Sequence, residues 1–221
     1  VMTIIQIAEH IAEKAKRQFD VPFNLQMQDT VVYHRARYIA NKLQKNPALK
    51  TYYTQSASVD LVEVGKDECT DLAECGCENI LVTTEEIPRP LVIGTHPFSY
   101  VGSPSGVQAF GWSTFGTEKS LSASPITGKK QRHTYLNNKL YVFNDRNLDR
   151  LRFEGVYTDP RVLKNFKCGN DTTKLCYSDS LDFPIDDELI QVIVEQVLKI
   201  ELGKLRMFAE EKQEIKADQN V

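Results

Sequence analysis

The chain of 221 residues has no apolar run close to the roughly 20 residues that a membrane-spanning helix needs, so we expect no transmembrane segment. Its N-terminal segment also lacks the basic residues and the long apolar core of a secretory signal peptide. We therefore expect the chain to fold in the cytoplasm of the cell that makes it. Its five cysteines should then be reduced, and an odd number of cysteines fits a disulfide framework poorly.

An excess of positive charge is also missing. The formal net charge is −3, which argues against a dedicated high-affinity nucleic-acid binder, because such proteins rely on many basic contacts to phosphates. A local basic surface is compatible with this balance. Hydrophobic residues make up 41% of the chain and charged residues 26%, which favours a packed core over global disorder. The length allows one large domain or two small ones.

The common catalytic motifs are absent too. No glycine-rich loop ends in Lys-Ser or Lys-Thr, so no phosphate-binding loop is predicted. The stretch 102–106 resembles a nucleophile elbow, but Pro104 stands where the nucleophilic serine would be. The four histidines are scattered, and none has a second histidine or a carboxylate at metal-ligand spacing. We therefore predict no catalytic residue and no cofactor.

Two amphipathic helices are predicted near the N-terminus. The first covers residues 3–18 and shares an apolar face formed by Ile4, Ile7, Ala8, Ile11 and Ala15. The second starts at Asn24 as its N-cap and ends at Asn46, before Pro47. Its apolar stripe consists of Leu25, Val32, Ala36, Ile39 and Leu43.

The middle of the chain is predicted to be β-rich. Short strand-like runs occur at 59–64, 80–84 and 152–157, separated by clusters of Gly, Pro and Ser. The segment 134–143 predicts a tight hairpin around Asn137 and Asn138, because asparagine tolerates the positive φ that such turns need. Residues 99–130 are rich in Gly, Ser and Thr, and we expect a long, mobile loop or an extended arm there.

A third helix is predicted after Phe183. Asp186, Asp187 and Glu188 suit its first turn, where the helix dipole favours acidic side chains, so they need no catalytic explanation. Two neighbouring apolar stripes follow, formed by Leu189, Ile193, Val197 and Ile200 and by Ile190, Val194, Leu198 and Leu205. Only Glu188, Gln191, Glu195 and Lys199 share a polar face. The wide apolar arc predicts that this helix is covered from more than one side, with a neighbouring subunit as one cover.

Together these patterns predict an α+β fold, in which N- and C-terminal helices form a helical bundle with a β-rich module inserted between them. The predicted parts are N-terminal bundle helices at 1–56 and a β-rich module at 57–180, with its arm at about 99–130. A C-terminal bundle helix and a charged tail occupy 181–221.

The cysteines leave two interpretations open. Cys69, Cys75 and Cys77 precede Cys168 and Cys176 by about ninety residues. Zinc accepts four thiolates in a tetrahedron, but these spacings differ from the usual two-to-four-residue knuckle. The thiols are either simply buried or used by a small metal- or thiol-dependent enzyme built on Cys75, Cys77, Cys168 and Cys176.

Two basic clusters also have two interpretations. They are His34, Arg35 and Arg37 with Lys42 and Lys45, and the run Lys129, Lys130, Arg132 and His133. Each is either a solvated face or a weak, sequence-independent contact to phosphates. A regulatory DNA-binding module is a third functional class, disfavoured by the net charge and by the lack of a recognition-helix signature.

A set of short sequence segments, in a fixed order along the chain, resembles a known family. The segments are Arg35–Asn46, Val62–Val64, Glu68–Cys77, Ile87–Leu91, Leu140–Val142, Phe153–Pro160, Cys176–Asp179, Phe183–Ile185 and the final helix. In this order, over residues 30 to 205, they resemble the small ring or head-to-tail connector structural proteins of crAss-like tailed bacteriophages.

The resemblance implies a virion protein of the neck or tail that acts without catalysis. It implies a homo-oligomeric ring of twelve copies below the portal protein, with the β module directed toward the next tail or ring protein and genomic DNA passing non-specifically through the bore. The expected contacts to the portal or DNA are Arg35, Arg37 and Lys42. The expected packing residues of the bundle and of the contact between subunits are Leu189, Ile193, Val197 and Leu198.

Overall fold

The structure is a computed structural model that describes residues 2–64, 80–92, 94, 96–145, 147–168, 176–200 and 203. The chain packs into two compact units. The first combines Val1–Asn41 with Asp179–Val221, and the second is Lys42–Ser178. The predicted division at 56/57 and 180/181 stays a prediction.

Helix α1 (Ile4–Lys14) opens the first unit. A capping box starts it: the Thr3 hydroxyl accepts the Gln6 N–H, and the Gln6 side chain accepts the Thr3 N–H. Its buried face is Ile4, Ile7, Ala8, Ile11 and Ala12. The predicted helix is therefore confirmed, although it ends at Lys14, just before Lys16 takes a positive φ of 58°.

Helix α2 (Val21–Lys45) begins earlier than predicted. The Asp20 carboxylate accepts the Phe23 N–H at 3.0 Å, so Asp20 rather than Asn24 caps the helix. Pro22 fits the first turn, where its missing N–H costs nothing. Leu25, predicted to be buried, is 58% exposed, whereas the rest of the predicted stripe is buried: Val32, Ala36, Ile39 and Leu43.

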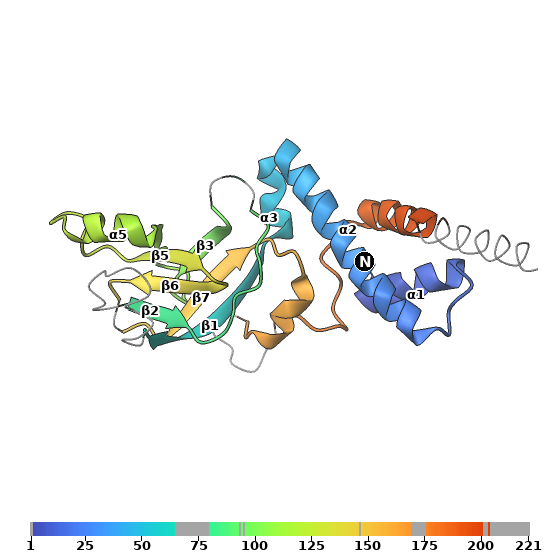
Figure 1. Ribbon diagram of the computed structural model, residues 1–221, viewed down its shortest axis with the longest axis horizontal. Helices are drawn as coiled ribbons and strands as arrows, with labels where there is room; N and C mark the ends of the chain where they lie inside the picture. Colours follow the sequence, from blue (N-terminus) through green and yellow to red (C-terminus); the bar gives the residue numbers. More distant parts are fainter. Residues whose placement is uncertain are drawn as a thin grey trace, which may run out of the picture. The chain divides into compact units, whose positions relative to one another are not determined.

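Residues 187–200 form the C-terminal helix among the described residues (Figure 1). It joins α2 through a hydrogen bond from the Tyr38 hydroxyl to the Gln196 side chain. The segment before it joins the N-terminus, because the Phe183 N–H donates to the Met2 carbonyl at 3.0 Å. The chain is thus mixed α+β as predicted, while the bundle arrangement of its helices stays a prediction.

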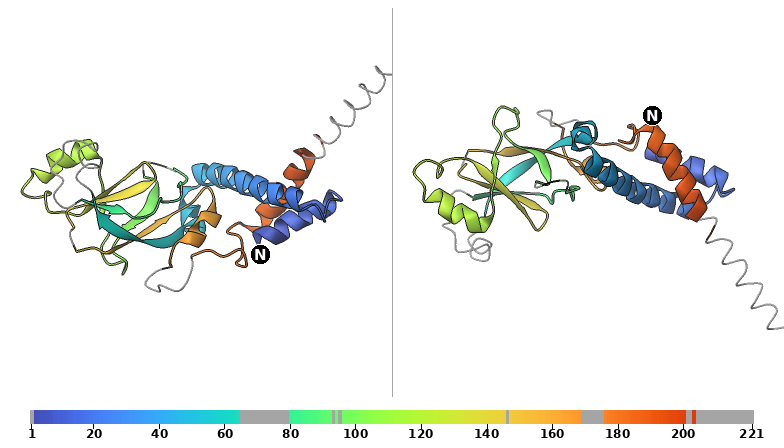
Figure 2. Two further views of the ribbon diagram at one scale, coloured as in Figure 1. Left: turned by 60° about the horizontal axis from the view of Figure 1, so that its bottom comes forward. Right: turned by 90° about the horizontal axis from the view of Figure 1, so that it is seen from above.

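The second unit holds a curled β-sheet (Figure 2). It follows two short helices, η1 (Pro47–Leu49) and α3 (Lys50–Tyr53). Seven strands of the described residues form the sheet in the order β3-β7-β1-β2-β6-β5-β4. Their bounds are β1 (Gln55–Glu63), β2 (Ile80–Thr83), β3 (Phe98–Gly102), β4 (Gly111–Trp112), β5 (Arg132–Leu136), β6 (Lys139–Phe143) and β7 (Arg150–Gly155). A 3-10 helix, η2 (Pro160–Asn165), follows β7.

The predicted hairpin is confirmed in strands β5 and β6. Asn137 and Asn138 occupy the turn with φ values of 50° and 60°, as a two-residue turn with both central residues left-handed requires. The register pairs His133 with Val142 and Leu136 with Lys139.

Strands β3 and β4 stand at the two ends of the sheet order, and the short segment 103–110 connects them. The Phe110 N–H donates to the Val101 carbonyl at 2.8 Å, and the Ser103 N–H donates to the Gln108 carbonyl at 2.9 Å. Residues 108–110 thus pair with β3 and lead directly into β4. Gly102 permits this approach, because a Cβ there would lie 2.1 Å from the Gln108 carbonyl oxygen.

Residues 99–130 hold regular structure where we expected a loop or arm. They contain most of β3, all of β4, and helix α5 (Phe115–Ser122). Thr114 caps α5, and its hydroxyl accepts the Thr117 N–H. Helix α5 lies against the sheet (Figure 1), since the Phe115 ring packs edge-on against Tyr141 and Phe143 at centroid distances of 5.1 and 5.2 Å.

The outer face of the sheet has an apolar region and a charged region. Beside α5 it is apolar, with the buried side chains Ile80, Val82, Tyr141 and Phe143. On β1 and β7 it is charged, where Arg150 pairs with Asp60 at 2.8 Å and Arg152 donates to Ser56 at 3.0 Å. Strand alternation places the buried residues Ala57, Val59, Leu151 and Phe153 on the opposite, inward face.

Candidate functional site

The C-terminal helix carries the predicted packing residues. Ile193 and Val197 have no exposed surface, so they belong to the core of their own unit in this conformation. Leu189 and Leu198 are half-buried. Ile200 was predicted to lie on the same stripe as Ile193, but it is 40% exposed. The predicted stripe is therefore buried at Ile193 and Val197 and reaches the surface at Ile200.

The first basic cluster is divided by burial. Arg35 is fully buried and His34 is 5% exposed, whereas Arg37 is exposed. Burial lowers the pKa of His34, and the nearby Arg37 charge lowers it further. Lys42 is half-buried, with its ammonium 5.9 Å from the centre of the Tyr53 ring. Among the three predicted contacts to portal or DNA, only Arg37 presents a fully accessible charge.

Arg35 has a structural role that the sequence did not reveal. Its Nε donates to the Pro184 carbonyl at 2.8 Å, and its guanidinium lies 5.5 Å from the centre of the Phe183 ring. It therefore fastens α2 to the segment that leads into the C-terminal helix. The Arg35 side chain has no exposed surface, so a contact of Arg35 with DNA or a portal would require another conformation, and this role stays a prediction.

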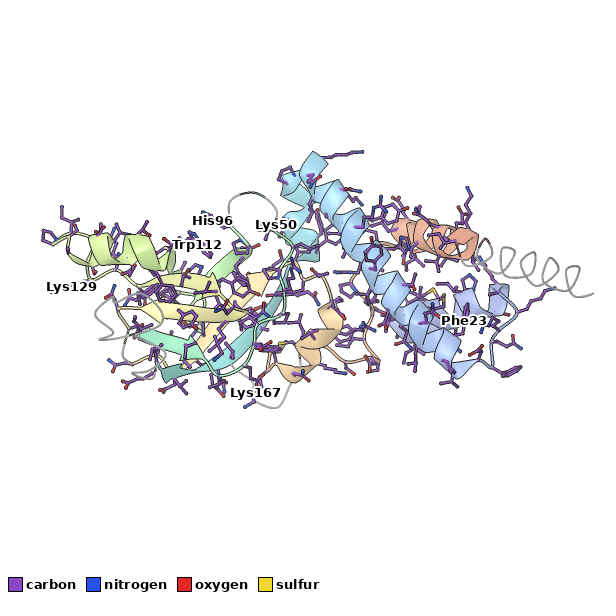
Figure 3. The ribbon with its side chains drawn as sticks, viewed as in Figure 1. Phe23, Lys50, His96, Trp112, Lys129 and Lys167 are labelled. Atoms are coloured by element: carbon purple, nitrogen blue, oxygen red, sulfur yellow. The ribbon has the colours of Figure 1, made fainter. Side chains whose placement is uncertain are left out.

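The second basic cluster is divided in the same way. Lys129 and Lys130 are exposed, as Figure 3 shows for Lys129, but Arg132 and His133 are each 6% exposed. Arg132 forms a two-pronged pair with Glu118 of α5, with Nε to Oε2 at 2.6 Å and a terminal nitrogen to Oε1 at 2.5 Å. Its other terminal nitrogen donates to the Thr127 carbonyl at 2.5 Å. This pair holds α5 against the sheet.

A row of three rings lies along the start of β4 and β5. Trp112 stands between His96 and His133, at centroid distances of 5.7 and 5.4 Å, and Figure 3 shows His96 and Trp112 as neighbours. His133 Nδ1 donates to the Phe110 carbonyl at 3.1 Å. Burial lowers the pKa of His133 to about 4, with nearby His96 acting in the same direction and the hydrogen bond opposing it. His133 is therefore neutral at physiological pH.

One groove of the second unit is lined mainly by polar and charged residues. It has a volume of 800 Å³ and is lined by Lys50, Thr51, Thr54, Ser56, Gly94, His96, Phe98, Ser99 and Glu154. Glu154 is paired with Arg152 at 2.5 Å, and burial lowers the pKa of Lys50. Among the described residues that line this groove, no nucleophile is hydrogen-bonded to a base, the pairing that covalent catalysis requires.

The structure describes only two of the five cysteines in the cysteine hypothesis, Cys168 and Cys176. Cys69, Cys75 and Cys77 lie outside the described residues. Cys168 and Cys176 are half-buried free thiols. Burial raises the pKa of the Cys176 thiol, and its hydrogen bond with Cys168 raises it further, so it stays protonated and is a poor nucleophile.

Neither a metal site nor a membrane-spanning helix occurs in the residue ranges that the structure describes. No group of three or more His, Cys, Asp or Glu side chains in them could hold a metal ion. None of the helices in the same ranges is both long and apolar enough to cross a bilayer.

Accessible apolar side chains on helices are the remaining candidate surface. On α2, Val21 is 65% exposed, Leu25 58% and Tyr33 63%, and on the C-terminal helix Val192 is 43% exposed. Sequence reasoning missed Val21, Tyr33 and Val192. Val21 lies four residues before Leu25, Tyr33 lies eight residues after Leu25, and Val192 lies eight residues before Ile200. Multiples of four recur on one side of a helix, and this spacing was the signal that could have found them.

Comparison with protein families gives one match over almost the whole chain. The family described as phage tail ring protein 2, from crAss-like phages, matches residues 6–220. No curated protein matches significantly.

Proposed function

The chain belongs to the phage tail ring protein 2 family, and we propose that it forms a ring at the head-to-tail junction of the virion. In this proposal twelve copies link the portal protein to the next tail or ring protein, and genomic DNA passes through the bore. The observation that carries the proposal is the family match over residues 6–220. A ring is a closed head-to-tail assembly, so each copy needs two different contact faces.

The surface of the first unit supports a role in assembly. Its helices leave Leu25 and Tyr33 exposed on α2, and Val192 and Ile200 exposed on the C-terminal helix. Leu189 and Leu198, half-buried in one copy, would be covered further at a contact between copies. Ile193 and Val197 would support this contact from below, as core residues, rather than touch the neighbour.

The charge of the chain supports a bore that does not hold DNA tightly. Each copy has a formal charge of −3, and a ring multiplies whatever basic contacts one copy offers. Arg37, Lys45, Lys129 and Lys130 are the exposed basic residues of the two clusters, and Lys42 is half-accessible. A few such point charges give weak, salt-sensitive contacts to phosphates, which suits DNA that must move.

Cryo-electron microscopy of purified phage particles tests the proposal. We expect a ring of this chain directly below the portal, with twelvefold symmetry and the chain present in the particle's protein content. A particle that lacks the chain would refute a virion role. A ring elsewhere in the tail would refute the junction while leaving the family role intact.

A further inference from the structure

Helix α2 carries a continuous row of exposed side chains. Val21, Leu25, Asp29, Tyr33 and Arg37 follow one another at four-residue spacing, and all five are exposed. Residues four apart touch along a helix, so they form one ridge, which we call the α2 ridge. Isolated exposed apolar residues are ordinary on protein surfaces, but three of them on one ridge form a stripe.

The C-terminal helix carries a second row. Glu188, Val192, Gln196 and Ile200 form the C-terminal ridge, in which Val192 is 43% and Ile200 40% exposed. Gln196 is half-buried and accepts the Tyr38 hydroxyl of its own chain, so Val192 and Ile200 are the apolar residues that this ridge offers to a partner. The neighbouring row is fully exposed and polar: Asp187, Gln191, Glu195 and Lys199. The apolar residues of this ridge are therefore bordered by charges, which is the anatomy of a contact core with a polar rim.

We propose that the α2 ridge of one copy packs against the C-terminal ridge of the next copy, and that this head-to-tail contact builds the ring. The inference rests on the proposed function, since the ring supplies the second copy as the occupant. Two different ridges meeting each other make a heterologous contact, the kind that closes into a ring. Interdigitated rows of residues four apart are also the commonest way in which helices pack.

The charges of the two helices agree with one orientation. If the helices run antiparallel with Asp29 opposite Lys199, Arg37 lies about 12 Å further along α2 and reaches the turn between Glu188 and Glu195. Tyr33 then falls between Val192 and Ile200. A parallel crossing that pairs Asp29 with Lys199 would carry Arg37 past residue 203. The antiparallel register therefore pairs opposite charges on both sides of Tyr33, and it places Leu25 beyond Lys199, close to Ile200.

The test mixes two variants, each of which carries a charged substitution in one of its two ridges. Leu25→Asp breaks the α2 ridge and Val192→Asp breaks the C-terminal ridge, and both positions are exposed enough for the chain to fold. Each variant alone should lose self-association by at least about tenfold, measured by size-exclusion chromatography with light scattering. Mixed together, they should form pairs and stop there, because only one intact ridge of each kind remains.

Controls separate this contact from general effects of a new charge. Ile126→Asp introduces the same charge at an 81% exposed site of the other unit and should assemble like the wild type. Circular dichroism checks that every variant is folded. Asp29→Lys and Lys199→Asp should each weaken assembly, and their combination should restore it.

Three results would overturn the proposed contact. They are normal assembly of either ridge variant, assemblies larger than pairs in the mixture, and a wild-type chain that stays monomeric at its highest soluble concentration. None of them bears on whether the chain is found at the junction in particles. The ring assignment itself fails only if the particle reconstruction lacks the chain.

Discussion

Removing Arg132 should destabilise the β-rich unit far more than removing an arginine from its surface. In the perturbation we choose, Arg132→Met, the buried Glu118 keeps one described partner, the Asn144 side-chain nitrogen at 3.3 Å. Both side chains of the original pair are 7% exposed, so water cannot replace the lost guanidinium.

The size of the effect follows from this burial. Leaving one member of a buried ion pair without its partner typically costs about 3–5 kcal/mol of unfolding free energy. That is a large share of the roughly 5–15 kcal/mol that stabilises a typical domain. Replacing both members by apolar residues, Glu118→Leu with Arg132→Met, should recover most of the loss because no buried charge is then left.

Urea unfolding followed by tryptophan fluorescence measures the effect. Trp112 is the only tryptophan of the chain, and it pairs with His133 in the strand that carries Arg132. Arg150→Met is the matched control, since Arg150 pairs with an Asp60 side chain that is 53% exposed. We expect the control to cost about 0–1 kcal/mol.

Two results would refute the reasoning. Equal losses for Arg132→Met and Arg150→Met would mean that burial does not decide the strength of the pair. A double variant, Glu118→Leu with Arg132→Met, that is less stable than Arg132→Met alone would mean that the apolar replacements cannot fill the site.

Three further predictions concern other elements. His133 has its pKa lowered to about 4, so the unfolded chain takes up a proton first, and stability should fall by about 3 kcal/mol between pH 6.5 and 4. In urea titrations His133→Gln should flatten that slope, and an unchanged slope would assign it elsewhere. Arg35→Met should cost the helical unit about 1–3 kcal/mol in thermal melts followed by circular dichroism, against less than about 0.5 for the exposed Arg37→Met, and equal costs would contradict a buried role. Asn138→Gly should stabilise the hairpin by about 0.5 kcal/mol in urea unfolding, because glycine adopts its φ of 60° without strain; a loss would contradict the turn assignment.

Local patterns predicted the elements whose cause is local. The apolar face of α1, the end of α2 before Pro47, and the turn at Asn137 and Asn138 all follow from side chains within a few positions. The mixed α+β class followed from the same patterns.

The errors came from contacts between residues far apart in the sequence. Helix α5 lies in a Gly-, Ser- and Thr-rich stretch that looks like a loop, and Arg132, fourteen positions beyond Glu118, holds it in place. Arg35 looks like a surface residue until Pro184, 149 positions away, accepts its hydrogen bond. Composition and periodicity carry no information about such partners. The family resemblance depended instead on ordered segments spread along the chain, and the match over residues 6–220 confirmed it.

The pairing of residues 108–110 with β3 has a consequence for copies of the chain that lie side by side. An open sheet edge is a template on which any neighbouring strand can add, and copies held side by side would risk fusing their sheets indiscriminately. Here the backbone groups of Val101 and Ser103 are already satisfied within the chain. At this edge of the sheet, recognition between neighbours is thereby left to side chains, which discriminate between partners in a way that backbone pairing does not.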